Sequence, residues 1–424
     1  RNSISSRKKW RDWVNFFKKN DKQSFMKKNF SLYGLPSEIN FCKKCVISNQ
    51  RPNSVVEFKN KDNFKKGIIL NKKGVCQACD YAQIKNDIDW NNREKKLKQY
   101  LSKFRKKTGY DCIVPGSGGK DSAFTAHILK YKYGMNPLTV TWSPHMYTEV
   151  GKKNFYNWIN KGGFDNILFT PNGALQRYLT RLSFINLLHP FQPFIIGQRM
   201  IGPKIAMKYN IKLIMYGETG AQYGNDISEN KIPIMDINYF STKNHNNIYL
   251  GSEKIKNIIK NNIFKPSDLN PYLPILRKDI RNNFEVHHMS YYKYWDPQEN
   301  FYYASKHCGF ETNQERTEGT YSKYSSIDDK VDNFHYYTTL IKFGIGRATY
   351  DACQEIRNKK ITREEGINLV KLYDCEFPKK YFRDFLDYIN VSENNFIKII
   401  NSFRSEHIWK KISRYEYKLK RTVY

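Results

Sequence analysis

Apolar and polar positions follow two different spacings between residues 108 and 240. Short runs rich in Val, Ile, Leu and Phe predict strands, and longer segments with apolar residues three or four positions apart predict helices. Strands separated by helices favour parallel pairing through right-handed crossovers, so the sequence predicts a doubly wound α/β sheet. The predicted strands are residues 111–115, 137–142, 166–170 and 211–217. The predicted helices are residues 122–133, 150–162, 173–187 and 198–209.

Three regions of the chain differ in this pattern. Residues 1–95 are basic and contain four cysteines, residues 96–245 alternate strands with helices, and residues 246–424 are aromatic-rich with mainly helical patterns. We therefore expect an N-terminal module, an α/β domain and a helical C-terminal region. The turn-rich segment 228–247 is expected to be a linker or a lid. The pattern at residues 7–28 favours a solvated helix over a basic amphipathic arm.

The formal net charge of +32 would suit an anionic partner, such as nucleic acid or a phosphorylated substrate. Only 19 of the 72 basic residues are arginines, however, and the lysines are spread along the whole chain. A nucleic-acid surface usually concentrates Arg and Lys on one face, so a general bias in composition explains the charge better. We therefore do not expect nucleic acid to be a partner.

The most apolar stretch of the chain, residues 184–202, is interrupted by polar residues and prolines. No stretch approaches the apolar length that a membrane span requires, and the N-terminus has no apolar signal-peptide core. We expect a cytoplasmic protein without a membrane partner. In that compartment its cysteines should stay reduced or bind metal.

Four cysteines occur as two pairs separated by thirty residues: "CKKC" contains Cys42 and Cys45, and "CQAC" contains Cys76 and Cys79. Two such pairs supply four thiolates at the local spacing that a tetrahedral zinc ion needs. Four protein ligands leave no open position on the metal for catalysis, so we predict a structural zinc site. The other four cysteines are isolated and are expected to pack as small hydrophobic residues.

A glycine-rich sequence, "VPGSGGKDSAF", spans residues 114–124 at the end of the first predicted strand. Glycines let successive backbone N–H groups point into one concavity, and the helix that follows adds its positive N-terminal end. The arrangement predicts a phosphate site, although it fits neither the GxxxxGK[ST] nor the GxGxxG pattern. Asp121 beside this loop is suited to hold a magnesium ion that bridges a polyphosphate.

The string "SGGKDS" resembles the SGGxDS motif of the PP-loop, or N-type, ATP pyrophosphatases. The resemblance implies a PP-loop ATPase domain in which ATP is split at the α-phosphorus, a substrate oxygen is adenylated and pyrophosphate leaves. It implies that Lys120 and Asp121 are catalytic, and that Asp121 binds magnesium. The adenine is expected near Trp142, at the end of the next strand. The residues that the resemblance assigns to ATP binding are Ser117, Gly118, Gly119, Lys120, Asp121, Ser122, Trp142 and Gly217.

Gly217 and Glu218 close the predicted strand 211–217 at the same edge of the sheet, where doubly wound folds bind their ligands. The resemblance implies that Glu218 is also catalytic, either by holding a second magnesium ion or by positioning the adenylated substrate. The alternative is that the Glu218 carboxylate only caps the glycine turn and has no catalytic role.

Three further segments narrow the resemblance to the N-acetyl sugar amidotransferases of bacterial surface-glycan pathways. They are residues 141–173, 189–218 and 316–365. Those pathways make O-antigen sugars or nonulosonic acids such as pseudaminic acid, and the resemblance covers most of the chain. It implies that an acetamido group becomes an acetamidino group, with ammonia from a separate glutaminase and synthase pair. Gln222 departs from the family pattern, in which an acid is expected.

The expected chemistry needs a sugar site over Glu218, built in part by residues 316–337. An arginine there can pair with a sugar carboxylate or phosphate, and hydroxyl groups can recognise the sugar. Acids on one helical face can bind a cation or take protons from ammonium, although a capped surface helix would also place acids there. The candidate substrate residues are Arg316, Thr320, Tyr321, Ser322, Tyr324, Asp328, Asp329, Asp332, His335, Lys342 and Arg347.

Two other functions stay open. tRNA-thiolating PP-loop enzymes also join such a domain to zinc-binding cysteine pairs, and the positive charge would suit tRNA. They usually need catalytic cysteines near the ATP site, whereas this chain offers only Cys112 before the loop and no later C-x-x-C pair. A nucleotide-binding regulator without turnover is the third possibility, and the intact "SGGKDS" string argues against it.

Overall fold

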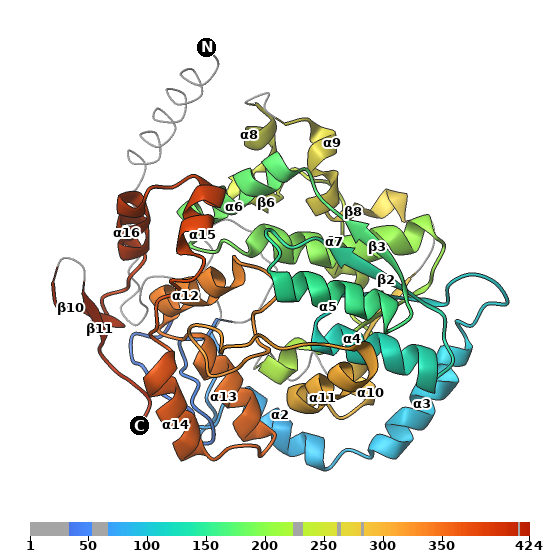
Figure 1. Ribbon diagram of the computed structural model, residues 1–424, viewed down its shortest axis with the longest axis horizontal. Helices are drawn as coiled ribbons and strands as arrows, with labels where there is room; N and C mark the ends of the chain where they lie inside the picture. Colours follow the sequence, from blue (N-terminus) through green and yellow to red (C-terminus); the bar gives the residue numbers. More distant parts are fainter. Residues whose placement is uncertain (1–33, 53–66, 224–231, 261–263, 281–283, 414–415) are drawn as a thin grey trace.

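The computed structural model describes residues 34–52, 67–223, 232–260, 264–280, 284–413 and 416–424 (Figure 1). The helix expected at residues 7–28 and part of the segment 228–247 lie outside these ranges. The predicted fold class is confirmed: a doubly wound parallel sheet follows a cysteine-containing module and precedes a mainly helical region.

Five parallel strands form the central sheet in the order β3-β2-β1-β4-β9. The strands are β1 (Cys112–Pro115), β2 (Pro137–Trp142), β3 (Asp165–Phe169), β4 (Leu213–Tyr216) and β9 (Glu285–His288). The chain adds β2 and β3 on one side of β1, and then returns to add β4 and β9 on the other side. The direction of winding therefore reverses between β1 and β4. Their carboxyl ends form the crevice in which such folds bind ligands.

Helices cover both faces of the sheet, as a parallel sheet requires. Ile113 and Ile214 pack into one core with α6 and α7, whereas Val114 and Met215 pack into the other with helices that include α4, α5 and α11. The helices are α4 (Lys120–His127), α5 (Glu149–Asn160), α6 (Gly173–Leu187), α7 (Gln192–Lys208), α10 (Met289–Tyr292) and α11 (Pro297–Cys308). Helix α4 continues as a π-helical turn, Ile128–Lys132. Alternation of side chains along each strand thus gives two separate hydrophobic cores.

Short elements connect β4 to β9. They are a 3-10 turn (Gly220–Tyr223), a second 3-10 turn (Ile237–Tyr239), β5 (Ser241–Thr242), β6 (Tyr249–Leu250), β7 (Glu253–Lys254), α8 (Ile255–Lys260), α9 (Pro266–Leu269), β8 (Ile275–Leu276) and two further 3-10 turns (Asn270–Tyr272 and Arg277–Asp279). Several of their residues, including Phe240 and Tyr272, are fully buried in the same core as α6 and α7. This connection therefore belongs to the body of the sheet domain.

The C-terminal region packs against both other parts of the chain. Its elements are α12 (Asp332–Phe343), α13 (Arg347–Arg357), α14 (Arg363–Tyr373), α15 (Phe382–Ile389), α16 (Glu393–Ser402), β10 (Trp409–Lys411) and β11 (Tyr417–Leu419). Phe184 of α6 stacks on Phe396 and meets Phe385 edge to face. The cysteine module, which leads into α2 (Gln77–Asn86) and α3 (Trp90–Ser102), shares a hydrophobic core with α13 and α14 (Figure 1).

The structure differs from the predicted pattern at two places. Strand β9 was not predicted, because two of its four residues are histidines; His287 is fully buried, and its ring nitrogens lie 2.9 and 3.1 Å from the Tyr292 hydroxyl and the Glu285 carboxylate. The predicted boundary at residue 245 therefore does not coincide with the edge of the sheet. Helix α7 begins at Gln192, six residues before the predicted helix, since Pro193 is tolerated in its first turn.

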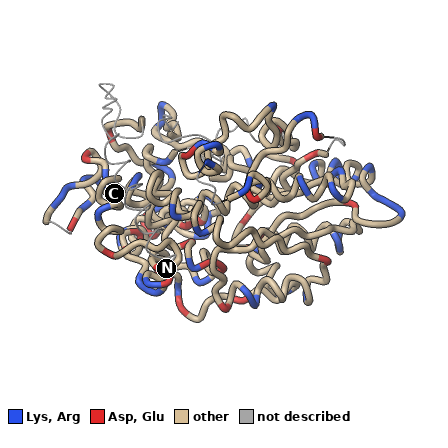
Figure 2. Tube along the Cα trace, turned by 90° about the horizontal axis from the view of Figure 1, so that it is seen from above, with Lys and Arg blue, Asp and Glu red and all other residues tan. Residues whose placement is uncertain are grey.

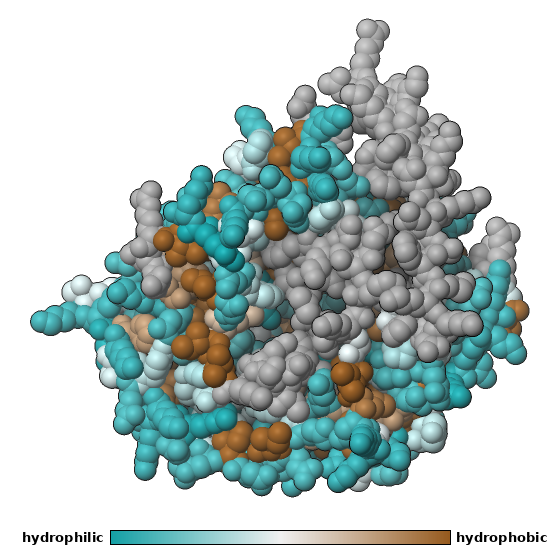
Figure 3. Space-filling model, turned by 180° about the vertical axis from the view of Figure 1, so that it is seen from behind, coloured by the Kyte–Doolittle hydropathy of each residue, from teal (hydrophilic) through white to brown (hydrophobic). Residues whose placement is uncertain are grey.

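The surface carries its charges in a dispersed form. Lys and Arg are distributed over the described trace with acids between them (Figure 2). On the face seen in Figure 3, hydrophobic side chains form separate small groups among hydrophilic ones. Among the helices of the described residues, none has both the length and the apolar character needed to cross a bilayer.

Gly197 of α7 tests how tightly this helix packs on the sheet. A Cβ atom there would lie 2.3 Å from the indole ring of Trp142, which is buried. We expect Gly197→Ala to lower the free energy of unfolding by about 1–3 kcal/mol, measured by urea denaturation. Gly173→Ala is the matched control, because nothing lies within 4 Å of its Cβ position; equal losses in both variants would contradict the close packing.

Candidate active site

The glycine-rich loop connects β1 to α4, and two of its glycines, Gly116 and Gly118, have no room for a side chain. A Cβ on Gly116 would lie 2.2 Å from Cβ of Ser122, and one on Gly118 would lie 2.9 Å from the carbonyl oxygen of Asn154. Gly118 also has a φ of 87°, which L-residues rarely adopt. The loop ends at the N-terminus of α4, where backbone N–H groups favour anions.

Side chains of the loop are held in place by hydrogen bonds. Lys120 and Asp121 form an ion pair, and Asn300 Nδ2 donates to Asp121 Oδ1 at 3.0 Å. Ser117 Oγ donates to Asp328 Oδ2 at 3.0 Å, which links the loop to the C-terminal region. Ser122 Oγ donates to the carbonyl oxygen of Gly119 at 3.0 Å. The loop is therefore braced by residues from α4, α11 and the segment before α12.

A cavity of about 270 Å³ opens over this loop. Its floor is residues 115–122, and its far side includes Gly217 and Glu218, which follow β4. Arg199, Tyr324 and Arg347 also line it. Three positively charged side chains, those of Lys120, Arg199 and Arg347, line this cavity beside the N-terminus of a helix, which suits an anion. Three carboxyl groups, those of Asp121, Glu218 and Asp328, line it too, which suits a cation bound together with that anion.

A second cavity, of about 880 Å³, adjoins the first. The residues that line both are Lys120, Gln198, Arg199, Glu218, Tyr324, Ser325 and Arg347. Beyond this shared wall, the large cavity lies between α7, the segment 232–239 and the helices α12 and α13. Molecules bound in the two cavities would therefore meet at Glu218 and Lys120.

Glu218 lies at this junction and is held by Tyr223, whose hydroxyl donates to Glu218 Oε1 at 3.0 Å. Burial raises the pKa of the Glu218 carboxyl, and the nearby Asp121 raises it further, while Lys120 acts in the opposite direction. A carboxyl with a raised pKa beside a second carboxylate is suited to a cation or to proton transfer.

The structure brings six of the eleven candidate substrate residues to the two cavities. Tyr324 and Arg347 line both, Asp328 lines the small one, and Asp332, His335 and Lys342 line the large one. Tyr324 stacks on Phe301 with a centroid distance of 4.6 Å, which fixes its ring between the two cavities. Their role in substrate binding stays a prediction.

The other five candidates line neither cavity and have partners of their own. Arg316 forms a two-point ion pair with Glu376, at 2.6 and 2.8 Å, and so is already neutralised. Asp329 accepts hydrogen bonds from the backbone of His145, Met146 and Val331. The remaining three hydroxyl groups are engaged within the protein: Thr320 Oγ1 donates to Asp351, Tyr321 Oη donates to Glu355, and Ser322 Oγ accepts from backbone N–H groups.

Trp142 also lies away from the cavities, with its indole ring buried in the core between Phe169 and Tyr272. The expected adenine contact therefore could involve only its backbone or its neighbours. Conversely, sequence reasoning missed Gln198, Arg199 and Asn300. Gln198 and Arg199 in the apolar stretch 184–202 were a usable signal, because an arginine is rarely placed within a mostly buried helix unless its charge has a partner.

Asp332 and His335 both line the large cavity, and burial shifts their pKa values in opposite directions. Burial raises the pKa of Asp332 to about 7, although the positive charge of Arg347 acts to lower it. Burial lowers the pKa of His335 to about 3, with Lys342 and Arg347 adding to this effect. At neutral pH the imidazole is therefore uncharged, whereas Asp332 can give or take a proton.

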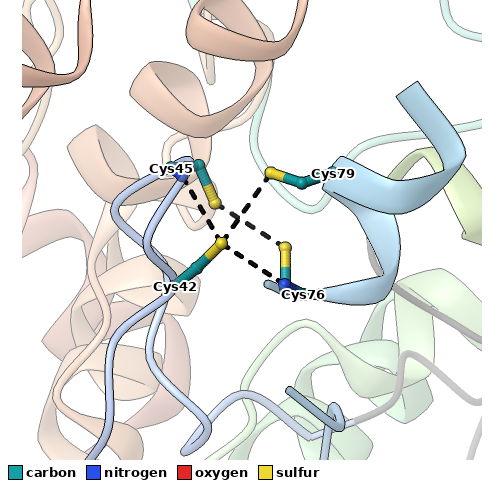
Figure 4. A group of neighbouring side chains, drawn as sticks. All are labelled: Cys42, Cys45, Cys76 and Cys79. Atoms are coloured by element: carbon teal, nitrogen blue, oxygen red, sulfur yellow. Dashed lines mark hydrogen bonds between the residues drawn. The ribbon is translucent and has the colours of Figure 1, made fainter. Parts of the chain in front are cut away.

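The four cysteines of the two pairs converge, as Figure 4 shows. Their Sγ atoms all lie within 4.8 Å of one another, with 3.9 Å between Cys42 and Cys79 and 3.7 Å between Cys45 and Cys76. Tetrahedral zinc at a Zn–S distance of about 2.3 Å separates its sulfur ligands by about 3.8 Å. The four thiols therefore fit a tetrahedral metal ion, and all four are buried.

Comparison with known proteins links the C-terminal region to glycan biosynthesis. Residues 318–423, about a quarter of the chain, match the family described as LPS biosynthesis protein WbpG-like, C-terminal domain. This match confirms the resemblance to surface-glycan enzymes for that region. A segment of 77 residues is 35% identical to an uncharacterized protein of Methanocaldococcus jannaschii; it covers 18% of this chain and 27% of that relative.

Three solved structures resemble this chain only weakly. An NH3-dependent NAD synthetase from Campylobacter jejuni is 15% identical with a TM-score of 0.25, over 31% of this chain and 57% of its own. An NMN synthetase from Francisella tularensis is 12% identical with a TM-score of 0.31, over 72% and 98%. A U34-tRNA thiolase from Methanococcus maripaludis is 11% identical with a TM-score of 0.28, over 77% and 93%. At these values the likenesses bear on neither fold nor function.

The cysteine cluster predicts a bound metal ion. We expect about one tightly bound ion per chain in the purified protein, measured by elemental analysis, because four buried thiolates complete a tetrahedral site. Cys76→Ser should lose the ion and lower the midpoint of urea unfolding, since metal binding is coupled to folding. Cys375→Ser, an exposed cysteine outside the cluster, is the control. Equal metal content in both variants would contradict the site.

Asp332 predicts a pH-dependent stability. Its pKa is 3.8 before burial and about 7 in the folded protein, so folding favours the protonated carboxyl. The stability that this group contributes at low pH is lost as the pH rises from about 4 to about 7. Asp332→Asn should therefore gain stability relative to the unchanged protein as the pH increases from 5 to 8, measured by urea unfolding. A difference that does not change with pH would contradict the shift.

Proposed function

We propose that this protein is an ATP-dependent, AMP-forming amidotransferase that converts the acetamido group of a surface-glycan sugar into an acetamidino group. The observation that carries the proposal is the wall shared by the two cavities. One side of that wall is a glycine-rich loop suited to a polyphosphate, and the other is lined by the region that matches LPS biosynthesis proteins. Such a junction lets a nucleotide meet a second substrate.

ATP would place its β- and γ-phosphates in the small cavity, against the backbone of residues 116–119 and the N-terminus of α4. Lys120, Arg199 and Arg347 would balance the negative charge of the phosphates. The carboxylates of Asp121 and Glu218 fit magnesium, a cation that prefers oxygen ligands, and the ion would neutralise charge on the departing pyrophosphate.

The reaction follows from the poor reactivity of an amide carbon. The amide oxygen of the sugar would attack the α-phosphorus of ATP, pyrophosphate would leave, and the carbon would then carry an adenylate leaving group. Ammonia would add to that carbon, the bond to the AMP oxygen would break, and the amidine would form with release of protons. Charged and hydrogen-bonding groups fixed around the phosphates supply most of the catalysis in such transfers.

The C-terminal region would complete the site around the sugar. Tyr324 lines both cavities, and Asp332, which lines the large one and interacts with Arg347 of the shared wall, is suited to accept a proton from the attacking ammonia. Arg347 and Lys342 supply positive charge for an acidic sugar. Enclosure of the junction would limit hydrolysis, because water would otherwise capture the adenylated intermediate.

The proposal also includes a metal ion and a source of ammonia. The metal ion at the four cysteines would be zinc with a structural role, and a glutaminase and synthase pair would supply ammonia in the cytoplasm. A tRNA-thiolating function gains no support from the site, because none of the eight cysteines lines either cavity.

The proposal is tested by incubating the protein with ATP, magnesium, ammonium and a panel of N-acetylated acidic sugars. We expect AMP and pyrophosphate, together with a sugar in which NH has replaced one oxygen, detected by mass spectrometry. Asp121→Asn should reduce AMP formation by at least about 100-fold, because it removes a carboxylate ligand of the magnesium ion that would neutralise the phosphates. Asp387→Asn, in an exposed ion pair on α15, is the control. ADP with orthophosphate, or thiolated RNA, would contradict the proposal.

A further inference from the structure

The 3-10 turn Gly220–Tyr223 begins two residues after Glu218 and holds it through the Tyr223 hydroxyl. The helices that contact this turn most are α2 and α13. Helix α2 starts immediately after Cys76 and contains Cys79, so its first turn is part of the cysteine cluster (Figure 4). The turn beside Glu218 is therefore packed against the cysteine module, although more than a hundred residues separate them in sequence.

Lys85 makes the first contact between the cysteine module and the turn Gly220–Tyr223. It lies in the last turn of α2 and is 2% exposed. Its Nζ donates to the carbonyl oxygen of Trp295 at 2.8 Å and to Gln222 Oε1 at 3.4 Å, and it lies 4.2 Å from the ring centre of Tyr294. A buried cation held by two oxygens and an aromatic face has little freedom to move.

Arg357 is the second contact. Its Nη2 donates to the backbone carbonyl of Gln222 at 3.0 Å. It lies on α13 one turn after Cys353, which shares a hydrophobic core with the cysteine cluster. Cys76, Tyr223, Cys353 and Arg357 surround one void of about 10 Å³, so the metal-binding thiols and the turn are separated by little more than packed side chains.

Gln222 therefore accepts hydrogen bonds from two cations, one through its side chain and one through its backbone. Both contacts use acceptor oxygens that a glutamate would also offer, and the Gln222 Nε2 atom is buried without a hydrogen-bond partner among the described residues. The contacts therefore require an acceptor at this position and do not depend on its being an amide.

We propose that Gln222 is a positioning residue, through which the four-cysteine module fixes the turn that holds Glu218 by way of Tyr223. Metal at the cysteines holds the start of α2, α2 places Lys85, and Lys85 with Arg357 holds Gln222 and its turn. The effect on AMP formation rests on the proposed function, whereas the coupling between the module and the turn does not.

Hydrogen exchange of the segment 217–223 tests the coupling without any assay of activity. Gln222→Leu should increase its exchange about tenfold, because the side-chain hydrogen bond from a buried cation is lost. Gln222→Glu should keep the exchange slow, since it retains an acceptor for Lys85. Gln83→Leu on the exposed face of α2 is the matched control. Unchanged exchange in Gln222→Leu, or an equal increase in the control, would overturn the proposal.

Removal of the metal with a chelator tests the same link from the other end. We expect faster exchange in segment 217–223 together with residues 76–86, while β1 and β2 stay protected. Exchange that rises only around the cysteines would overturn the proposal. So would simultaneous loss of protection in all strands, since the metal would then serve stability of the whole protein.

Kinetics of AMP formation separate positioning from a structural role. Gln222→Leu should lower kcat more than it raises KM for ATP, because the turn holds Glu218 through Tyr223 and is not part of the phosphate loop. Gln222→Glu should restore kcat. Equal kcat values in both variants would remove the effect on catalysis. If no variant forms AMP, the proposed function fails, and hydrogen exchange still decides whether the turn is coupled to the module.

Discussion

Reversal of the strand order between β1 and β4 is the constraint on which the rest of the structure depends. It brings the glycine loop after β1 and the carboxylate turn after β4 to one crevice, because parallel strands end at the same edge of the sheet. Lys120 and Glu218, almost a hundred residues apart, line the same two cavities for this reason.

The sequence is informative about this sheet where local pattern decides the structure. Strands β1 to β4 are short apolar runs, and the helices between them have regular spacing, so both could be predicted. Strand β9 could not be, because His287 is acceptable in a buried strand only when Tyr292 and Glu285 contact its nitrogens. That condition is met by the fold and cannot be seen in the residues of the strand alone.

The same distinction applies to the site. The glycine loop and the cysteine pairs are local motifs, and the structure assembles them as their spacing indicates. Arg316 and Arg347 looked alike in sequence, yet Arg316 is paired with Glu376, sixty residues further on, and lines neither cavity, whereas Arg347 lines both cavities while paired with Asp351 on its own helix. Which arginine faces a cavity depends on the packing of distant segments, and this is known only from the three-dimensional structure.

The shared wall has an evolutionary consequence. Its glycine-rich side comes from the loop after β1, while much of its other side comes from residues 324–351 in a separate part of the chain. Substitutions in the second segment can reshape the large chamber and leave the glycine loop intact. Under the proposed function, relatives that act on different sugars could therefore diversify one half of this architecture and inherit the other half unaltered.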